Sequence, residues 1–136
     1  LERLVAMVEA QGGDSEVILN PDKFEKAPYV YEVKAEKDGY ITHIDAEGCG
    51  IASAMLGAGR ETKESEIDYT AGIILHKKTG EKVNKGDVLA ALYTSKEELF
   101  EAAAEKYRKS IFIEEKAPKK EPLVYARVTP KGIEKY

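Results

Sequence analysis

Residues 72–93 read GIILHKKTGEKVNKGDVLAALY, and this stretch decides the fold class. Two short apolar runs, residues 72–76 and 88–93, are separated by turns that contain Gly80 and Gly86. Short apolar runs bounded by glycine-containing turns are typical of β-strands. The stretch therefore predicts a compact β unit.

A second β unit is expected upstream, in residues 28–45. Residues 28–37 alternate, with Val33 and Ala35 on the apolar face, which predicts a half-buried strand. Asp38-Gly39 is typical of a tight type I′ turn. Residues 40–45 are therefore expected to return as the partner strand of a hairpin.

The first helix is expected at the start of the chain. Leu1, Leu4, Val5 and Val8 share one helical face, and Gly12-Gly13 ends the pattern. The sequence leaves open whether this face docks on upstream structure or packs on the domain's own sheet, because periodicity does not identify a partner.

Residues 46–56 predict a second helix, capped by Asp45 and apolar on all sides. A helix of this composition is expected to be buried all round, with Ala52 and Met55 enclosed. A third helix is expected after a capping box of Ser95 and Glu98. Its predicted inward side chains are Leu99, Phe100, Ala103 and Tyr107.

The remaining C-terminal elements are short. Residues 111–113 predict a strand, residues 114–122 a charged linker, and residues 123–128 a late edge strand before a polar tail. Together with the helices, these segments predict an α+β fold rich in short strands.

Composition excludes several classes of protein. The 136 residues include 25 acidic and 21 basic side chains, and the net charge of -4 argues against a nucleic-acid binder. No apolar run is long enough for a membrane span, and the basic-then-apolar pattern of a secretory signal is missing. Cys49 is the single cysteine, so a reducing, cytoplasmic location is expected.

The residue types that carry catalysis are not grouped in catalytic patterns. His43, His76 and Cys49 have no metal-ligand spacing, and Ser53 lies inside a predicted helix rather than at a nucleophile elbow. We therefore expect no catalytic residue, no cofactor-binding residue and no metal ligand. A small enzyme that uses His43 or His76 would need one of them beside a carboxylate in a cleft.

Gly57-Ala58-Gly59-Arg60 is the candidate functional segment. Its glycines follow a predicted helix, whereas phosphate-binding glycines precede one, so a C-terminal cap and tight turn is expected. Gly57 or Gly59 should have a positive φ. Two interpretations of Arg60 stay open: it assists closure of an interdomain cleft, or it pairs at the surface with Glu61, Glu64 or Glu66.

Two segments resemble the halves of a biotinyl/lipoyl domain. Residues 33–44 read V-x-A-x-x-x-G-Y-I-x-x-I and residues 80–92 read GEKVNKGDVLAAL, in swapped order with a helix between them. The Met-Lys-Met or Asp-Lys-Ala tripeptide that carries the modified lysine is missing. A free-standing lipoyl-like interaction domain without that lysine is the alternative function.

A set of ordered motifs resembles the C-terminal region of the pyrimidine-nucleoside phosphorylases, which include thymidine phosphorylase. The resemblance covers residues 1–92, whereas residues 95–136 fit a variable C-terminal end. The motifs are Gln11-Gly12-Gly13-Asp14, residues 35–46, Leu56-Gly57-Ala58-Gly59-Arg60, Ile67-Asp68, Gly72-Ile73, His76-Lys77-Lys78, Gly80, Val83, Gly86-Asp87 and Leu89-Ala90.

That resemblance implies a homodimeric parent enzyme that converts a pyrimidine nucleoside and phosphate to free base and pentose 1-phosphate. It implies an α/β-hammerhead with a barrel-sandwich portion at residues 28–114. Residues 1–27 would be a helical lead-in from upstream phosphorylase domains, and residues 115–136 a linker, edge strand and tail. The family's phosphate and base motifs are not found here; Lys109-Ser110 lacks the glycine-rich context. The fragment is therefore expected to be structural and cleft-closing, not catalytic.

Overall fold

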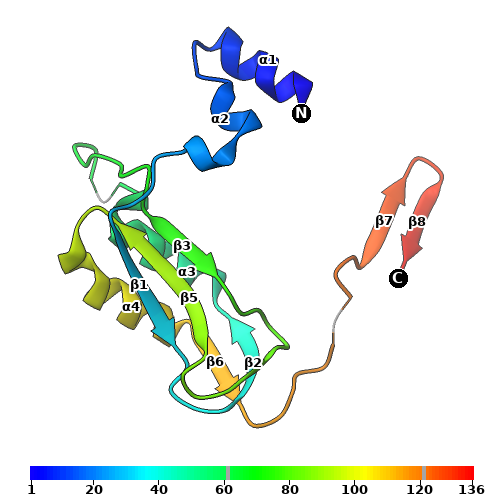
Figure 1. Ribbon diagram of the computed structural model, residues 1–136. Helices are drawn as coiled ribbons and strands as arrows, with labels where there is room; N and C mark the ends of the chain where they lie inside the picture. Colours follow the sequence, from blue (N-terminus) through cyan, green and yellow to red (C-terminus); the bar gives the residue numbers. More distant parts are fainter. Residues whose placement is uncertain (61, 121) are drawn as a thin grey trace.

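Figure 1 shows a computed structural model of the chain, which describes residues 1–60, 62–120 and 122–136. It combines helices with short strands, which confirms the α+β class. The helical elements are α1 (Glu2–Ala10), α2 (Glu16–Leu19), η1 (Pro21–Lys23), α3 (Ala46–Ser53), the π-helical turn η2 (Ala54–Ala58), η3 (Glu97–Leu99) and α4 (Phe100–Lys109). The strands are β1 (Tyr29–Lys34), β2 (Gly39–Ile44), β3 (Gly72–Leu75), β4 (Lys82–Val83), β5 (Val88–Thr94), β6 (Ile111–Glu114), β7 (Ala126–Thr129) and β8 (Gly132–Lys135).

The central strands form two antiparallel three-stranded sheets. One has the order β1-β5-β3, with Val33 opposite Ala90 and Gly72 opposite Tyr93. The other has the order β4-β2-β6, with Ile41 opposite Ile113. The pairing of β3 with β5 confirms the β unit predicted for residues 72–93.

The hairpin predicted at Asp38-Gly39 is wrong. β1 pairs with β5, whereas β2 pairs with β4 and β6, so the two strands belong to different sheets. A type I′ turn requires positive φ at both central residues, and no described non-glycine residue has one. Instead, the Asp38 side chain accepts a bond from the Lys85 amide at 2.7 Å. Gly39 is required by close approach, because a Cβ there would lie 2.6 Å from the Glu114 carbonyl oxygen.

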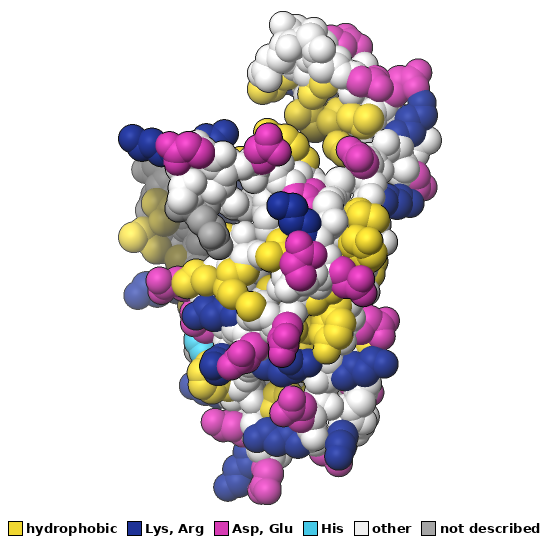
Figure 2. All heavy atoms as spheres, turned by 90° about the vertical axis from the view of Figure 1, so that its left-hand side faces the viewer, with side chains coloured by type: hydrophobic (Ala, Val, Ile, Leu, Met, Phe, Trp, Pro, Cys, Tyr) yellow, Lys and Arg dark blue, Asp and Glu magenta, His cyan; other side chains and the backbone are white. Residues whose placement is uncertain are grey.

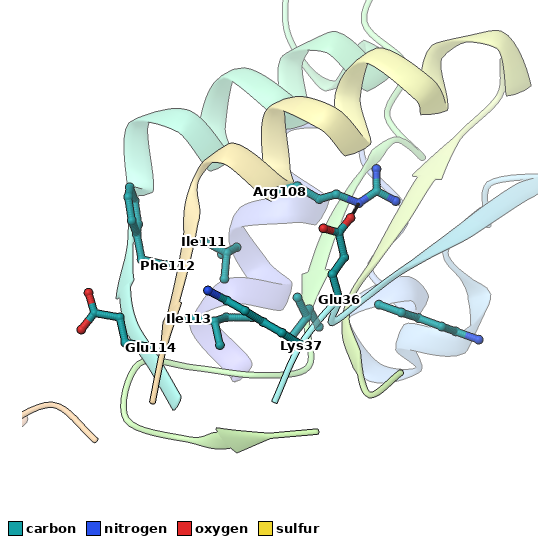
Figure 3. A pocket seen from close by; sticks show the side chains of 9 residues that line it. Glu36, Lys37, Arg108, Ile111, Phe112, Ile113 and Glu114 are labelled. Atoms are coloured by element: carbon teal, nitrogen blue, oxygen red, sulfur yellow. Dashed lines mark ion pairs between the residues drawn. The ribbon is translucent and has the colours of Figure 1, made fainter. Parts of the chain in front are cut away.

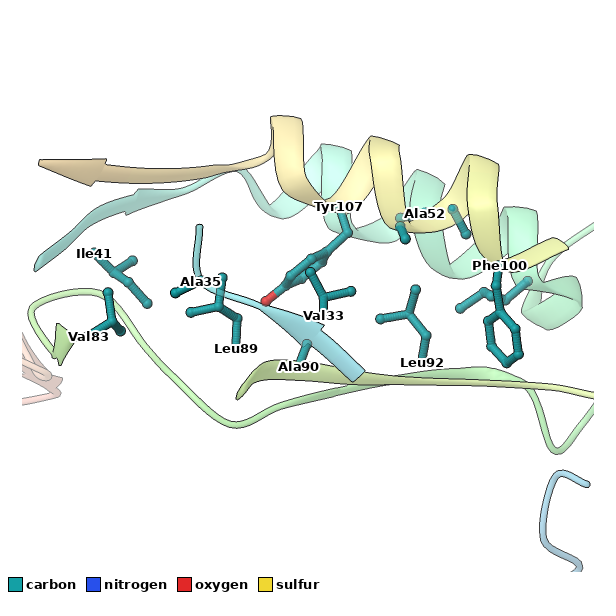
Figure 4. Close-up of a cluster of buried hydrophobic side chains, with 13 residues drawn as sticks. Val33, Ala35, Ile41, Ala52, Val83, Leu89, Ala90, Leu92, Phe100 and Tyr107 are labelled. Atoms are coloured by element: carbon teal, nitrogen blue, oxygen red, sulfur yellow. The ribbon is translucent and has the colours of Figure 1, made fainter. Parts of the chain in front are cut away.

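The hydrophobic core lies between the sheets and the antiparallel pair α3 and α4 (Figure 4). Tyr107 on α4 points toward the strands that carry Val33 and Ala90. Helix α4 therefore buries the face that the sequence predicted, apart from Leu99, which is half-buried. The fully buried core side chains include Val33, Ile41, Ala52, Leu56, Val83, Ala90, Leu92, Ala103 and Tyr107.

All-round burial of the helix at residues 46–56 is also wrong. Ala52 is fully buried, as predicted, but Met55 is half-buried and Ile51 exposes 44% of its surface. The helix packs closely on the side that carries Gly48. A Cβ on Gly48 would lie 2.1 Å from the Ser110 hydroxyl. Asp45 caps the helix as predicted, and accepts from the Glu47 amide at 3.1 Å.

The capping box predicted for the third helix does not form. Helix α4 begins through the 3-10 turn η3, and its N-cap makes no side-chain hydrogen bond. Ser95 instead donates its amide to the Asp68 carboxylate at 2.9 Å. A tertiary hydrogen bond from this residue has replaced the local one.

The N-terminal elements stand away from the sheets (Figure 1). Helix α1 ends in a Schellman motif, because Gly13 N–H donates to the Val8 carbonyl and Gly12 N–H to that of Glu9, both at 2.9 Å. No residue of α1 is buried, so its apolar face does not pack on the domain's own sheet. Of the two alternatives that the sequence left open, this removes the second.

The C-terminal elements form a separate hairpin. Among residues 1–60, 62–120 and 122–136, β7 pairs only with β8, with Val128 opposite Ile133, rather than adding to the edge of a central sheet. The prediction of one edge strand before a polar tail is therefore wrong, since the tail supplies the second strand. Two strands alone bury little surface, so this hairpin leaves its apolar side chains exposed.

Candidate functional site

The predicted functional segment lies where α3 ends. Gly57 has φ +106°, which confirms the expected positive φ, and it is a non-helical residue inside the π-helical turn η2. A Cβ on Gly57 would lie 3.2 Å from the Cβ of Asp68. Gly59 has an extended backbone, but it too is confined, because a Cβ there would lie 2.9 Å from that of Ala54. Both glycines are therefore needed, for different reasons.

Asp68 holds the chain that follows Gly57-Ala58-Gly59-Arg60 against the end of η2. Its amide donates to the Gly57 carbonyl at 2.9 Å. Its carboxylate accepts from the Thr70 amide at 2.9 Å, from the Thr70 hydroxyl at 2.7 Å and from the Ser95 amide at 2.9 Å. The backbone and the side chain of Asp68 thus together join the end of η2, the approach to β3 and the end of β5.

These hydrogen bonds set the charge state of Asp68. Desolvation raises the pKa of its carboxyl, but the bonds from Thr70 and Ser95 outweigh that effect and hold the pKa at about 2. The carboxylate is therefore ionised at neutral pH. Asp68 was not predicted as a site residue, although Asp-x-Thr is a pattern that forms such turns.

Arg60 and Tyr69 are exposed side chains that follow Gly57 and Asp68 closely in the sequence. Within residues 1–60, 62–120 and 122–136, Arg60 makes no ion pair with Glu64 or Glu66. The predicted partner Glu61 lies outside the described residues. Tyr69 exposes 91% of its surface, although it stands between two hydrogen-bonded residues.

This network lies at one identifiable end of the domain. Tyr29 at the start of β1 is opposite Thr94 at the end of β5, directly before Ser95. The chain enters β1 here from α1 and α2, which lie beyond this end of the sheet (Figure 1). Buried Thr94 also binds the segment to β5, since its hydroxyl donates to the Leu56 carbonyl at 2.7 Å.

A groove of about 650 Å³ opens between the end of β1 and β6 (Figure 3). Leu89, Ile111 and Ile113 supply its apolar side chains, whereas Lys34, Lys37 and Glu114 line it with charge. Arg108 and Glu36 point toward each other, with the guanidinium Nε 3.6 Å from a carboxylate oxygen. Arg108 also donates to the Tyr31 hydroxyl at 3.2 Å. The groove thus carries both signs of charge.

Neither histidine lines this groove. His43 is exposed and its ring lies tilted against that of Phe112, with the two ring centroids 5.6 Å apart, whereas His76 is exposed directly after β3. Burial raises the pKa of the Cys49 thiol, and nearby Asp45 adds to the shift, so the thiolate is disfavoured. The described residues hold no group of three or more potential metal ligands.

Lys109-Ser110 lies at the C-terminal end of α4. Lys109 is exposed and donates to the Glu105 carboxylate at 2.6 Å, whereas Ser110 is buried with its hydroxyl bonded to the Lys106 carbonyl. Because the dipole of a helix C-terminus disfavours an anion, this position does not suit a phosphate.

The molecular surface mixes charges of both signs. Figure 2 shows Lys and Arg side chains interspersed with Asp and Glu over the body of the domain. Hydrophobic side chains are exposed on the helical segment at the top of the same view. None of the described helices combines the length and the apolar character that a membrane crossing requires.

Comparisons with known proteins match most of the chain. Residues 40–114 match the family described as the pyrimidine nucleoside phosphorylase C-terminal domain. The chain is 42% identical over 130 residues to the pyrimidine-nucleoside phosphorylase of Bacillus subtilis (strain 168), which covers 95% of this chain and 29% of that protein. It is 46% and 42% identical over 99 residues to the proteins of that name from Staphylococcus epidermidis and Geobacillus stearothermophilus, covering 73% of this chain and 23% of each. The chain therefore spans less than a third of the length of these relatives.

Proposed function

The chain belongs to the pyrimidine-nucleoside phosphorylase family as its C-terminal domain, and from that premise we propose that it is the structural, cleft-closing part of a longer enzyme. The parent reaction would convert a pyrimidine nucleoside and phosphate to free base and pentose 1-phosphate. The observation that carries this proposal is the 42% identity over nearly the whole chain to less than a third of a phosphorylase.

The chemistry of phosphorolysis supports a non-catalytic role for this segment. The reaction needs donors that hold a phosphate dianion in line with the anomeric carbon and groups that stabilise the departing base. In the described part of the chain, the exposed lysines are scattered over turns, strands and helix ends, and the groove beside β6 carries both signs of charge. Catalytic groups would therefore come from the upstream phosphorylase domains.

Three finer features belong to the same proposal. Residues 28–114 would be an α/β-hammerhead domain, residues 1–27 a lead-in from upstream domains, and residues 115–136 a linker with the terminal hairpin. The exposed face of α1 supports the lead-in, because apolar side chains that are bare here would be covered in a longer chain. The parent would be a cytoplasmic homodimer.

Gly57-Ala58-Gly59-Arg60 would face the interdomain cleft, with Arg60 contacting the upstream domain on closure. Its support is the rigid mounting of the segment by Gly57 and Asp68, together with the lack of an ion pair from Arg60 to Glu64 or Glu66 in the described residues. Closure that excludes water is a way to complete a catalytic site, so a loop residue can limit turnover without touching substrate.

A chimaera tests the proposed function. This chain would replace the matching segment of the Bacillus subtilis relative, and phosphorolysis of uridine and thymidine would be measured. We expect an active chimaera, and expect the relative lacking that segment to be inactive. A folded but inactive chimaera would contradict the proposal.

Arg60→Ala in the chimaera tests the cleft-facing segment separately. We expect lower turnover with unchanged thermal stability. Lys63→Ala is the matched control, because Lys63 is another exposed cation close by in the sequence. Equal activity of the two variants would make Arg60 an ordinary surface residue.

A further inference from the structure

Tyr69 is the most exposed aromatic side chain of the central domain, with 91% of its surface in solvent. Its neighbours in the sequence are tied down by hydrogen bonds, since Asp68 accepts from Thr70 and from Ser95. A large aromatic ring projecting from a fixed turn is unusual for a free surface. Tyrosine and arginine are also the residue types that concentrate binding energy at protein interfaces.

The backbone around Tyr69 is held on both sides. The Asp68 amide donates to the Gly57 carbonyl at 2.9 Å, and the Ala71 amide donates to the Asp68 carbonyl at 3.2 Å. A contact residue whose backbone is already ordered loses less conformational entropy on binding. The turn therefore presents Tyr69 in a preorganised form.

The position of Tyr69 identifies the direction from which a partner would approach. It follows Asp68, whose carboxylate is bonded to Ser95 at the end of β5. The same end of the sheet receives the chain from α1 and α2 (Figure 1). The Bacillus subtilis relative extends far beyond the matched segment, which is 29% of its length. Most of that protein is therefore available to meet this end.

We propose that Tyr69 and Arg60, which follow the hydrogen-bonded residues Asp68 and Gly57 in the sequence, form the surface by which this domain docks on the upstream domains of the phosphorylase chain; this rests on the proposed function. The partner surface would offer an apolar pocket for the ring, with a hydrogen-bond acceptor at its base for the phenol hydroxyl. A carboxylate at its rim would meet the Arg60 guanidinium. The groove beside β6 is a weaker candidate, because Arg108 and Glu36 already pair at its edge.

Hydrogen exchange compares the isolated chain with the chimaera. We expect amides of residues 57–60 and 68–71 to exchange at least about tenfold more slowly in the chimaera, because docking removes local opening there. Tyr69→Ser should abolish most of that slowing. The control is Phe112→Ser, which removes another exposed aromatic ring, beyond the far end of α4. This control should keep the slowing.

The outcomes separate this inference from the proposed function. An active chimaera with no slowing at residues 68–71, or with slowing that Tyr69→Ser preserves or Phe112→Ser also removes, would overturn the Tyr69 surface alone. An inactive chimaera without slowing would overturn both. In the isolated chain, Tyr69→Ser should leave exchange at residues 57–60 unchanged; faster exchange there would show that Tyr69 acts on its own domain.

Discussion

The centre of the molecule and its two flanks use apolar residues in opposite ways. The sheets with α3 and α4 enclose side chains such as Val33, Leu56 and Tyr107 completely. Helix α1 and the hairpin β7–β8 bury none of theirs, although Leu4, Val128 and Ile133 are just as apolar. An apolar face in the sequence therefore indicates that the segment packs on another segment. The structure shows whether that other segment lies within the described chain.

The largest expected effect lies in the core, where two adjacent side chains differ in burial. Leu56→Ala should lower the free energy of unfolding by about 2–5 kcal/mol, because Leu56 is fully enclosed. Met55→Ala should cost less, since Met55 is half-buried. Denaturant titration of both variants measures the difference. Equal losses would mean that the two positions are packed alike.

The next largest effect on stability is expected at Gly57, and Gly50 of the same helical segment should respond in the opposite direction. Gly57→Ala should destabilise by about 1–3 kcal/mol, because φ is positive and Asp68 lies close to the added Cβ. Gly50→Ala is the control: no atom lies within 4 Å of its added Cβ, so it should stabilise by about 0.5–1 kcal/mol. Thermal unfolding of the two variants measures whether each one is less or more stable than the wild type. If Gly57→Ala left the stability unchanged, an alanine at position 57 would not be strained.

A smaller and pH-dependent effect is expected at Asp68. Asp68→Asn should destabilise by about 1 kcal/mol at pH 7, because an amide group then faces the Ser95 amide donor. The folded pKa of Asp68, about 2, lies below its ordinary value of 3.8. Its carboxylate therefore contributes stability that is fully present above pH 3.8 and is lost as pH falls toward 2.

The stability difference between wild type and Asp68→Asn should accordingly narrow over that acidic range. Glu64→Gln is the control, because Glu64 is exposed and accepts no hydrogen bond from the described residues. A difference that stays constant down to pH 2 would assign the effect of Asp68→Asn to packing instead of charge.

The smallest effects are expected on the flanks. Leu4→Ser and Val128→Ser should each change the unfolding free energy of the isolated chain by under about 0.5 kcal/mol, since both side chains are exposed. In the chimaera, Leu4→Ser should destabilise measurably, because upstream structure would cover it. A large loss in the isolated chain would show that α1 packs within this domain.

Local sequence patterns predicted the helices and strands better than they predicted which segments pair with one another. The strands at residues 72–75 and 88–94, the Asp45 cap and the inward face of α4 were all readable from periodicity and turn chemistry. The hairpin at Asp38-Gly39 was not, because pairing of β1 with β5 outweighed the local turn preference. Ser95 likewise gave its amide to Asp68 rather than to a capping box.

The candidate site was predictable only in part. The helix-ending glycines were visible in the sequence, and Gly57 has the expected φ. The tertiary bonds of Asp68 and the exposure of Tyr69 were not visible, because they depend on segments that are distant in the sequence. The resemblance to the family came from motifs that recur in order along residues 1–92.

We propose that this chain works only as part of a longer phosphorylase. The most direct measurement is phosphorolysis of uridine and thymidine by the rigorously purified isolated chain in the presence of inorganic phosphate. We expect no release of free base above the buffer blank. Turnover that co-purifies with the chain would contradict it, because the catalytic groups would then lie within these 136 residues.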